Sequence, residues 1–173
     1  MLASLSWKLP ILSLFTNEDM DVQYLDHQRP LYLSTMINEV QVRCALVDMR
    51  SCINLIPLST LQAVKISQKK IQGVPMEVKG FGGVSKYSKG HIQLVLKVGP
   101  IVALNRFHVE DFVVSYHVLL GKPWLHKHQL ISSTYHQCVK GRLIGKPIRI
   151  ALIFPKKRPP NQERVSHSPH VLQ

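Results

Sequence analysis

The sequence predicts a mainly β protein, and three observations support this class. Short runs of β-branched and aromatic residues recur along the chain, and Gly, Pro, Asn and Ser separate them. Stretches with a helical period are few, so we expect no more than one or two short helices. Hydrophobic residues make up 45% of the 173 residues, which is enough for one domain with a core and extensions at its ends.

The first predicted elements form a hairpin that ends in an acidic residue. Residues 31–37 and 40–47 read as strands, and Asn38 and Glu39 lie in the turn between them. In the second strand apolar positions alternate, which places one set of side chains on a common face: Val40, Val42, Cys44 and Leu46. Asp48 follows directly, where a buried strand ends in a tight loop.

The rest of the domain continues as strands with two helical interruptions. Pro57 suits the first turn of a short helix over residues 57–64, because its missing N–H does no harm there. A strand over residues 118–120 stops at Gly121, and a second helix with Pro123 in its first turn follows. The remaining predicted strands are residues 76–79, 91–98, 101–104, 107–109, 137–139 and 143–150.

The two ends of the chain lack such patterns. Residues 1–28 form an irregular N-terminal segment; its apolar start is interrupted by Lys8 and Pro10, which is unlike a secretory signal. We place the folded domain at residues 29–152. Residues 153–173 form a basic tail that we expect to be disordered.

Charge and cysteine content limit the partners and the compartment. The net charge is +12 and the pI is near 9.9, so the surface should attract polyanions. Three cysteines without paired spacing argue against a disulfide framework and for a reducing compartment, the cytoplasm or the nucleus. No apolar run approaches the roughly 18 residues of a membrane span, so no membrane partner is expected.

Asp48 has two interpretations on residues alone. A carboxylate at the end of a buried strand is costly unless it is hydrogen-bonded, paired or used in chemistry. It caps its own turn, as Asp commonly does, or it belongs to an active site. Gly80, Gly82 and Gly83 surround Phe81 after a predicted strand, and such a stretch bends freely or allows close approach.

The ordered series of motifs resembles a retropepsin-like aspartic protease, and more narrowly the protease segment of gypsy-type retrotransposon polyproteins of plants. The resemblance covers residues 29–150. The stretches that carry it, in the family's order, are Arg29-Pro30-Leu31-Tyr32, Leu46-Val47-Asp48, residues 53–61, Gly80-Phe81-Gly82-Gly83, Phe107-His108-Val109, residues 119–124 and residues 133–138.

The resemblance implies a small closed β-barrel that forms one subunit of a two-fold homodimer. Each subunit would contribute one catalytic aspartate, here Asp48, and the pair would share a proton and activate water against a peptide carbonyl. Residues 80–83 would form the flap over a peptide or polyprotein substrate. Leu119, Leu120 and Gly121 would support the catalytic loop. No cofactor and no metal is implied.

This chain departs from the family at the catalytic loop. The family has Asp-Thr-Gly or a near relative, and this chain has Asp48-Met49-Arg50-Ser51. Met49 lacks the hydroxyl that hydrogen-bonds across the dimer axis, a loss of about 1 kcal/mol or more per loop. Arg50 places a long side chain and a permanent cation beside the carboxylate, so the shared proton is harder to keep. We therefore expect a catalytically impaired copy.

Other sites have weaker support. His126 and His128 would point to different faces of a helix, and His136 and Cys138 supply only two ligands, so a zinc site is not expected. The segment 140–164 is strongly basic, which leaves open electrostatic attachment to RNA or DNA.

Three functions follow. The first is an aspartic endopeptidase domain for polyprotein processing, impaired in this copy. The second is a non-catalytic dimerisation or peptide-binding module, and the third is a basic nucleic-acid-binding fragment.

Overall fold

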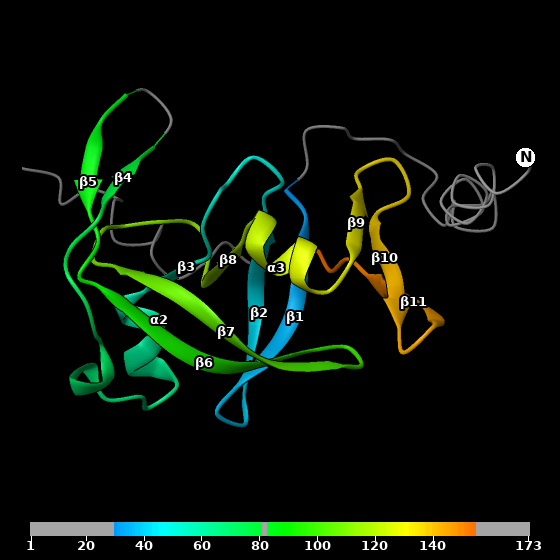
Figure 1. Ribbon diagram of the computed structural model, residues 1–173, viewed down its shortest axis with the longest axis horizontal. Coiled ribbons are helices and arrows are strands. Elements are labelled where there is room, and N and C mark those ends of the chain that lie inside the picture. The colour runs from blue at the N-terminus through cyan, green and yellow to red at the C-terminus, as the bar shows by residue number, and fades with distance from the viewer. Residues whose placement is uncertain (1–29, 81–82, 155–173) are drawn as a thin grey trace, which may run out of the picture.

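The structure is a computed structural model that describes residues 30–80 and 83–154. It contains a closed barrel of strand order β1-β2-β8-β3-β7-β6, a three-stranded sheet β11-β10-β9 and a two-stranded hairpin β4-β5 (Figure 1). The elements are β1 (Tyr32–Ile37), β2 (Val40–Val47), β3 (Leu55–Pro57), α2 (Leu58–Ala63), η2 (Gln68–Lys70), β4 (Glu77–Lys79), β5 (Ser85–Tyr87), β6 (His91–Val98), β7 (Ile101–Glu110), β8 (Val118–Leu120), α3 (Lys122–Lys127), β9 (Leu130–Ser133), β10 (Cys138–Leu143) and β11 (Lys146–Ala151).

The predicted β1–β2 hairpin is confirmed. Asn38 and Glu39 have φ values of 49° and 64°, and positive φ at both central residues matches the twist of two-residue hairpins. The prediction that the alternate residues of β2 share one face is wrong. The β1–β2 register shifts between Leu33 and Thr35. An irregularity of this kind reverses which residues of a strand point inward, so the buried set ends with Ala45 and Val47 in the main core, while Leu46 packs elsewhere.

The long β6–β7 hairpin forms most of one barrel wall. Its register is unbroken from His91↔His108 to Val98↔Ile101, and alternate residues of β6 are buried from Ile92 to Val98. Two predicted strands, 101–104 and 107–109, are one continuous strand. The main core lies inside the barrel and includes fully buried Phe107.

The C-terminal strand prediction over residues 143–150 is wrong in one respect. The chain reverses at Ile144 and Gly145, whose φ values are 50° and 75°, and this turn joins β10 to β11. Gly145 follows Leu143 and Ile144 in the sequence, and a glycine inside a predicted strand is a turn signal that the prediction passed over.

Both predicted helices are present and short. α2 begins after Pro57, which lies at the N-cap, and buries Leu58 and Leu61 against the barrel. α3 begins after Gly121 with Pro123 in its first turn. Trp124 is buried in the main core, as expected of a residue that docks the helix.

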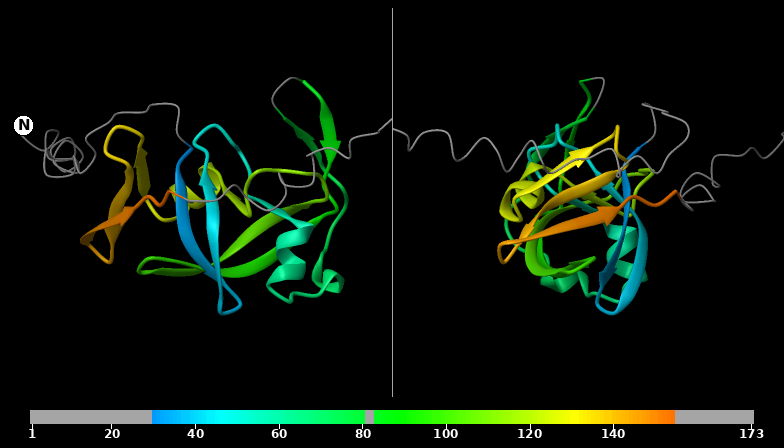
Figure 2. Two further views of the ribbon diagram at one scale, coloured as in Figure 1. Left: turned by 180° about the vertical axis from the view of Figure 1, so that it is seen from behind. Right: turned by 90° about the vertical axis from the view of Figure 1, so that its right-hand side faces the viewer.

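The β4–β5 hairpin and the loop that follows β2 rise on the same side of the barrel, and Figures 1 and 2 show this from three directions. The β9–β10–β11 sheet stands at the other end of the molecule. Within the described ranges, no helix is long and apolar enough to span a membrane.

Candidate active site

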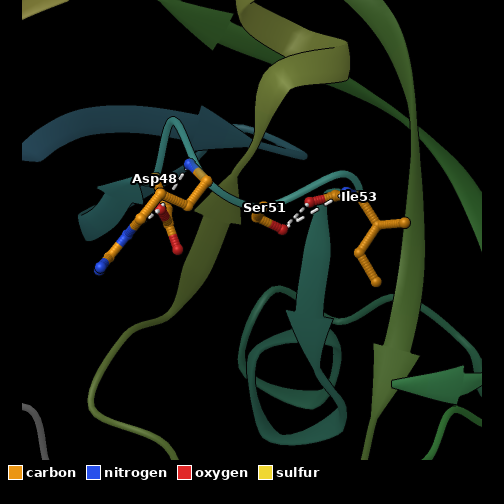
Figure 3. Close-up of polar contacts among 4 residues, drawn as sticks. Asp48, Ser51 and Ile53 are labelled. Carbon is orange, nitrogen blue, oxygen red and sulfur yellow. Dashed lines mark hydrogen bonds and ion pairs between the residues drawn. The ribbon is translucent and has the colours of Figure 1, made fainter. Parts of the chain in front are cut away.

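Asp48 lies at the start of a tight loop between β2 and β3. Its backbone N–H donates to the carbonyl of Leu120 at 3.0 Å, which joins the loop to β8. Its Oδ1 accepts a hydrogen bond from the Arg50 N–H at 2.9 Å (Figure 3). This is the local capping that Asp makes in turns. The side chain remains 25% exposed, so the carboxylate both caps its turn and reaches the surface.

Arg50 and Met49 occupy the two positions after this aspartate. The Arg50 Nε atom lies 3.7 Å from Asp48 Oδ1, and the arginine side chain is 75% exposed. An exposed ion pair at this distance contributes little stability. It does place a cation beside the carboxylate. Met49 is 52% exposed.

The loop is supported by hydrogen bonds within itself and by hydrogen bonds to β7 and to the start of α3. Ser51 Oγ donates to the carbonyl of Ile53 at 2.7 Å (Figure 3), and the carbonyl of Ser51 accepts from Lys122 N–H at 2.9 Å. Asn54 connects three segments. Its Oδ1 accepts from Gly121 N–H at 2.9 Å and its amide nitrogen donates to the carbonyl of Arg106 at 3.1 Å. These bonds hold the aspartate loop, the start of α3 and β7 together.

Gly121 allows this close contact. A Cβ atom at this position would lie 2.4 Å from the carbonyl oxygen of Ile53 and 2.8 Å from that of Ser51. Only glycine lets the two backbones approach so closely. Leu120 is buried in the main core, whereas Leu119 faces the other side of β8. The structure thus brings Leu119, Leu120 and Gly121 beside the Asp48 loop.

A second apolar cluster lies next to this loop. We define it by the buried residues Leu55, Tyr116 and Leu119, against which partly buried side chains pack: Tyr32, Leu46, Ile53, Val78 and Val114. Val78 belongs to β4, so the hairpin contacts the same cluster as residues of the loop region. Gly80 and Gly83 join β4 to β5, and their backbones are linked by a 3.4 Å hydrogen bond. Phe81 and Gly82 lie outside the described residues.

Sequence reasoning missed a buried polar pair beside this cluster. The Tyr116 hydroxyl donates to Glu110 Oε1 at 2.6 Å, and Glu110 is 0% exposed. Its Oε2 atom is buried and accepts no hydrogen bond within the described part of the chain. Burial raises the pKa of Glu110 to about 7, although the Tyr116 hydroxyl and the charge of Lys86 oppose this shift. Burial and the Glu110 charge also raise the pKa of Tyr116 above its usual range. The feature of the sequence that could have indicated this buried pair is the acid Glu110, which directly follows the apolar residue Val109 of a strand.

We expect Glu110 to make the folding stability pH-dependent. The folded protein keeps a proton that the unfolded chain releases above its ordinary pKa of 4.5, so the free energy of unfolding falls as the pH rises from about 4.5 through 7. Glu110→Gln imitates the protonated acid. The free energy of unfolding of this variant, taken relative to that of the wild type, should rise by about 2–3 kcal/mol between pH 5 and pH 8. Urea unfolding of both proteins measures this difference. Burial lowers the pKa of His108, His117 and His128, which favours unfolding as the pH falls below 6.5, but both proteins share this effect. A constant difference between wild type and variant across this range would contradict the prediction.

The histidines weighed as zinc ligands make contacts in separate places. His128 packs edge-on against Trp124 at 5.7 Å between ring centroids, and His136 Nδ1 lies 2.8 Å from Ser133 Oγ. Cys138 is buried. In residues 30–80 and 83–154, no three His, Cys, Asp or Glu side chains gather closely enough to hold a metal ion.

The barrel order, with an aspartate loop at the end of β2 and a hairpin on the same side of the barrel, defines the class of fold. The chain has the retropepsin-like acid-protease fold, a closed six-stranded barrel with two short helices, and the fold prediction is confirmed. Among solved structures it is similar to the retroviral protease-like domain of Ddi1 from Leishmania major, with a TM-score of 0.56 and 18% identity over 73% of this chain and 97% of that domain. The similarity shows the fold.

Two further structures are less similar. EIAV protease complexed with the inhibitor HBY-793 has a TM-score of 0.47 and 20% identity over 61% of this chain and 93% of that one. A retropepsin-like aspartic protease from Rickettsia conorii has a TM-score of 0.49 and 14% identity over 63% of this chain and 80% of that one. No family model and no curated protein matches the sequence. None of these comparisons supports nucleic-acid binding.

Proposed function

We propose that this chain is a retropepsin-like aspartic protease domain, derived from a gypsy-type retrotransposon polyprotein, that binds peptides but has lost efficient cleavage. The observation that carries the proposal is the Asp48 loop itself. The aspartate stands where β2 meets β8, is supported by Gly121, and has Arg50 beside its carboxylate.

The loss of catalysis follows from the two residues after Asp48. An aspartic protease needs two carboxylates that share one proton, so that one acts as base and the other as acid. Arg50 places a long, charged side chain whose Nε lies 3.7 Å from Asp48 Oδ1, so it crowds the carboxylate that a second aspartate has to approach. Met49 supplies no hydroxyl to lock two such loops together, so the pair would also be held less rigidly.

A homodimer is needed because one chain carries one such aspartate. Two surfaces favour it. Met49 is a half-exposed apolar side chain on the loop that would meet its symmetry mate. Among the residues that the structure describes, β9 pairs with β10 on one side only, and an unpaired strand edge is a template for pairing with another chain. Ile131 on β9 is also exposed.

We also propose that the protein is located in a reducing compartment, the cytoplasm or the nucleus. Cys44, Cys52 and Cys138 form no disulfide within the described residues, and Cys52 is exposed on the Asp48 loop. A free exposed thiol is typical of proteins that are kept reduced.

The test is peptide retention without turnover. The full chain is immobilised and incubated with a mixture of extended peptides at acidic and neutral pH, and both retained and released peptides are identified by mass spectrometry. We expect retained peptides of unchanged mass, and sedimentation equilibrium of the free chain should report a dimer. Robust cleavage that Asp48→Asn abolishes would show an active protease. The absence of any retained peptide would refute the binding function.

A further inference from the structure

A groove lies between β2 and α2, and none of its lining residues belongs to the Asp48 loop or to the second apolar cluster. Its volume is about 340 Å³, which is within the size range of ligand sites. The apolar part of its lining includes Val42 and Val64, which are buried in the main core, and Val40 and Ala63, which are exposed. Part of the apolar lining is therefore accessible to a ligand.

One edge of β2 is open along this groove. β2 pairs with β1 from Val40 onward, but on its other side it pairs with β8 only at residues 45–47. The groove lies on this second side, because His117, the residue before β8, lines it. In the part of the chain that the structure describes, residues 40–43 have no strand partner there. An open edge of this kind is a template for an added strand.

Hydrogen bonds tie α2 to both ends of this open edge. At one end Asn38 Nδ2, in the β1–β2 turn, donates to the carbonyl of Val64 at 2.9 Å. At the other end Thr60 Oγ1 donates to the carbonyl of His117 at 2.7 Å, and the His117 N–H donates to the carbonyl of Cys44 at 2.9 Å. The fold itself therefore sets the separation of α2 from the edge, and a ligand does not have to pay for opening the groove.

The direction of β8 decides how an extended peptide fits. β8 runs parallel to β2, and its pairing begins at Val118, opposite Ala45. A peptide that pairs with residues 40–43 in the same direction lies where β8 would lie if it began earlier, and its last residue comes beside His117. The protein's own chain occupies the next position along the edge, so the peptide has to end there. A parallel peptide therefore reaches this end of the groove with its terminal carboxylate.

Arg43 supplies a cation for that carboxylate. It lines the groove, is exposed, and directly precedes Cys44, which is bonded to His117. Among the described residues its guanidinium group has no ion-pair partner. The one acid of β2, α2 and the β1–β2 turn is Glu39, which lies in that turn, at the opposite end. Arg43 favours a carboxylate over the ammonium group that the first residue of an antiparallel peptide would bring.

We propose that the groove between β2 and α2 binds the free C-terminus of an extended peptide. The peptide backbone pairs in parallel with residues 40–43, its terminal carboxylate pairs with Arg43, and an apolar side chain near its end packs on the apolar lining. Backbone pairing of this kind gives affinity, while the carboxylate and the apolar side chain give specificity. The site uses other residues than the Asp48 loop and does not depend on the proposed function of that loop.

The experiment compares two labelled peptides that differ only at the C-terminus. Both have the sequence Thr-Val-Thr-Val-Leu with a fluorophore on the first residue, and one ends in a carboxylate, the other in a carboxamide. Fluorescence anisotropy with the full chain at pH 7.5 gives the Kd of each. We expect the carboxylate peptide to bind roughly tenfold or more tightly, because amidation removes a charge-assisted hydrogen bond to arginine. Equal Kd values, or no binding of either peptide, would overturn the proposal.

Variants assign the preference for the carboxylate to Arg43. Arg43→Gln should remove the preference while changing the Kd of the carboxamide peptide little, and Arg43→Lys should keep part of it. Arg142→Gln is the matched control, because Arg142 is exposed on β10 in the three-stranded sheet, and it should keep the full preference. If the preference survives Arg43→Gln, the carboxylate binds elsewhere and the assignment is wrong.

N-methylation of single amides in the carboxylate peptide tests the strand pairing. In an added strand the backbone groups of alternate residues face the neighbouring edge. Methylation of those amides should therefore weaken binding roughly fivefold or more, and methylation of the intervening amides should leave the Kd nearly unchanged. If all positions respond alike, the peptide does not pair with β2, and the proposed mode of binding fails.

Discussion

The double substitution Met49→Thr/Arg50→Gly is expected to give an active endopeptidase, with an increase of roughly 100-fold or more in kcat/KM over the unchanged chain. Arg50→Gly removes the long cationic side chain whose Nε lies 3.7 Å from Asp48 Oδ1, so a second carboxylate can approach across a dimer. Met49→Thr supplies the hydroxyl that links the two loops. Either change alone leaves one of the two defects, and we expect activity only when both are made.

The measurement is cleavage of a fluorogenic peptide by the full chain at acidic and neutral pH. The control is Asp48→Asn added to the double variant, which should abolish the restored turnover without changing the sedimentation coefficient. Activity in either single variant would show that the defects are not both limiting. An active wild-type chain would refute the proposed impairment.

The largest effect on stability is expected for Gly121→Ala, which should lower the free energy of unfolding by about 3 kcal/mol. The new methyl group would lie 2.4 Å from one carbonyl oxygen and 2.8 Å from another. Both belong to the backbone of the Asp48 loop, which Asn54 and Lys122 tie to β7 and α3. Neither carbonyl moves easily, so the loop or β8 has to shift.

Urea unfolding of the two proteins at one pH measures the difference. Gly80→Ala is the matched control, because no described atom lies within 4 Å of the position that a Cβ would take at Gly80, and it should stay within about 0.5 kcal/mol of the wild type. If Gly121→Ala is as stable as that control, the close packing of β8 on the loop is not a constraint on the fold.

Local features of the sequence were sufficient for much of the fold. The β1–β2 hairpin follows from two strand patterns around Asn38-Glu39, and α3 follows from Gly121 and Pro123 after an apolar strand. The position of Asp48 at the end of β2 follows in the same way. These features depend on residues that are neighbours in the sequence, so pattern and turn chemistry are enough to predict them.

The errors lie where partners are distant in the sequence. The inward face of β2 depends on a shift in its register with β1. The hydrogen bond from Tyr116 to buried Glu110 joins the end of β7 to the chain just before β8. An acid after an apolar strand reads as a turn residue until the surrounding burial is known.

The sequence by itself therefore determined the β class, the β1–β2 hairpin, the two short helices and the aspartate at the head of its loop, because these depend on local periodicity and turn residues. Only the tertiary structure decided which side chains meet. It placed Arg50 at an ion-pair distance from Asp48, Gly121 against the loop backbone and the Tyr116 hydroxyl against buried Glu110. Such contacts arise from strand register and barrel closure, which join segments far apart in the chain.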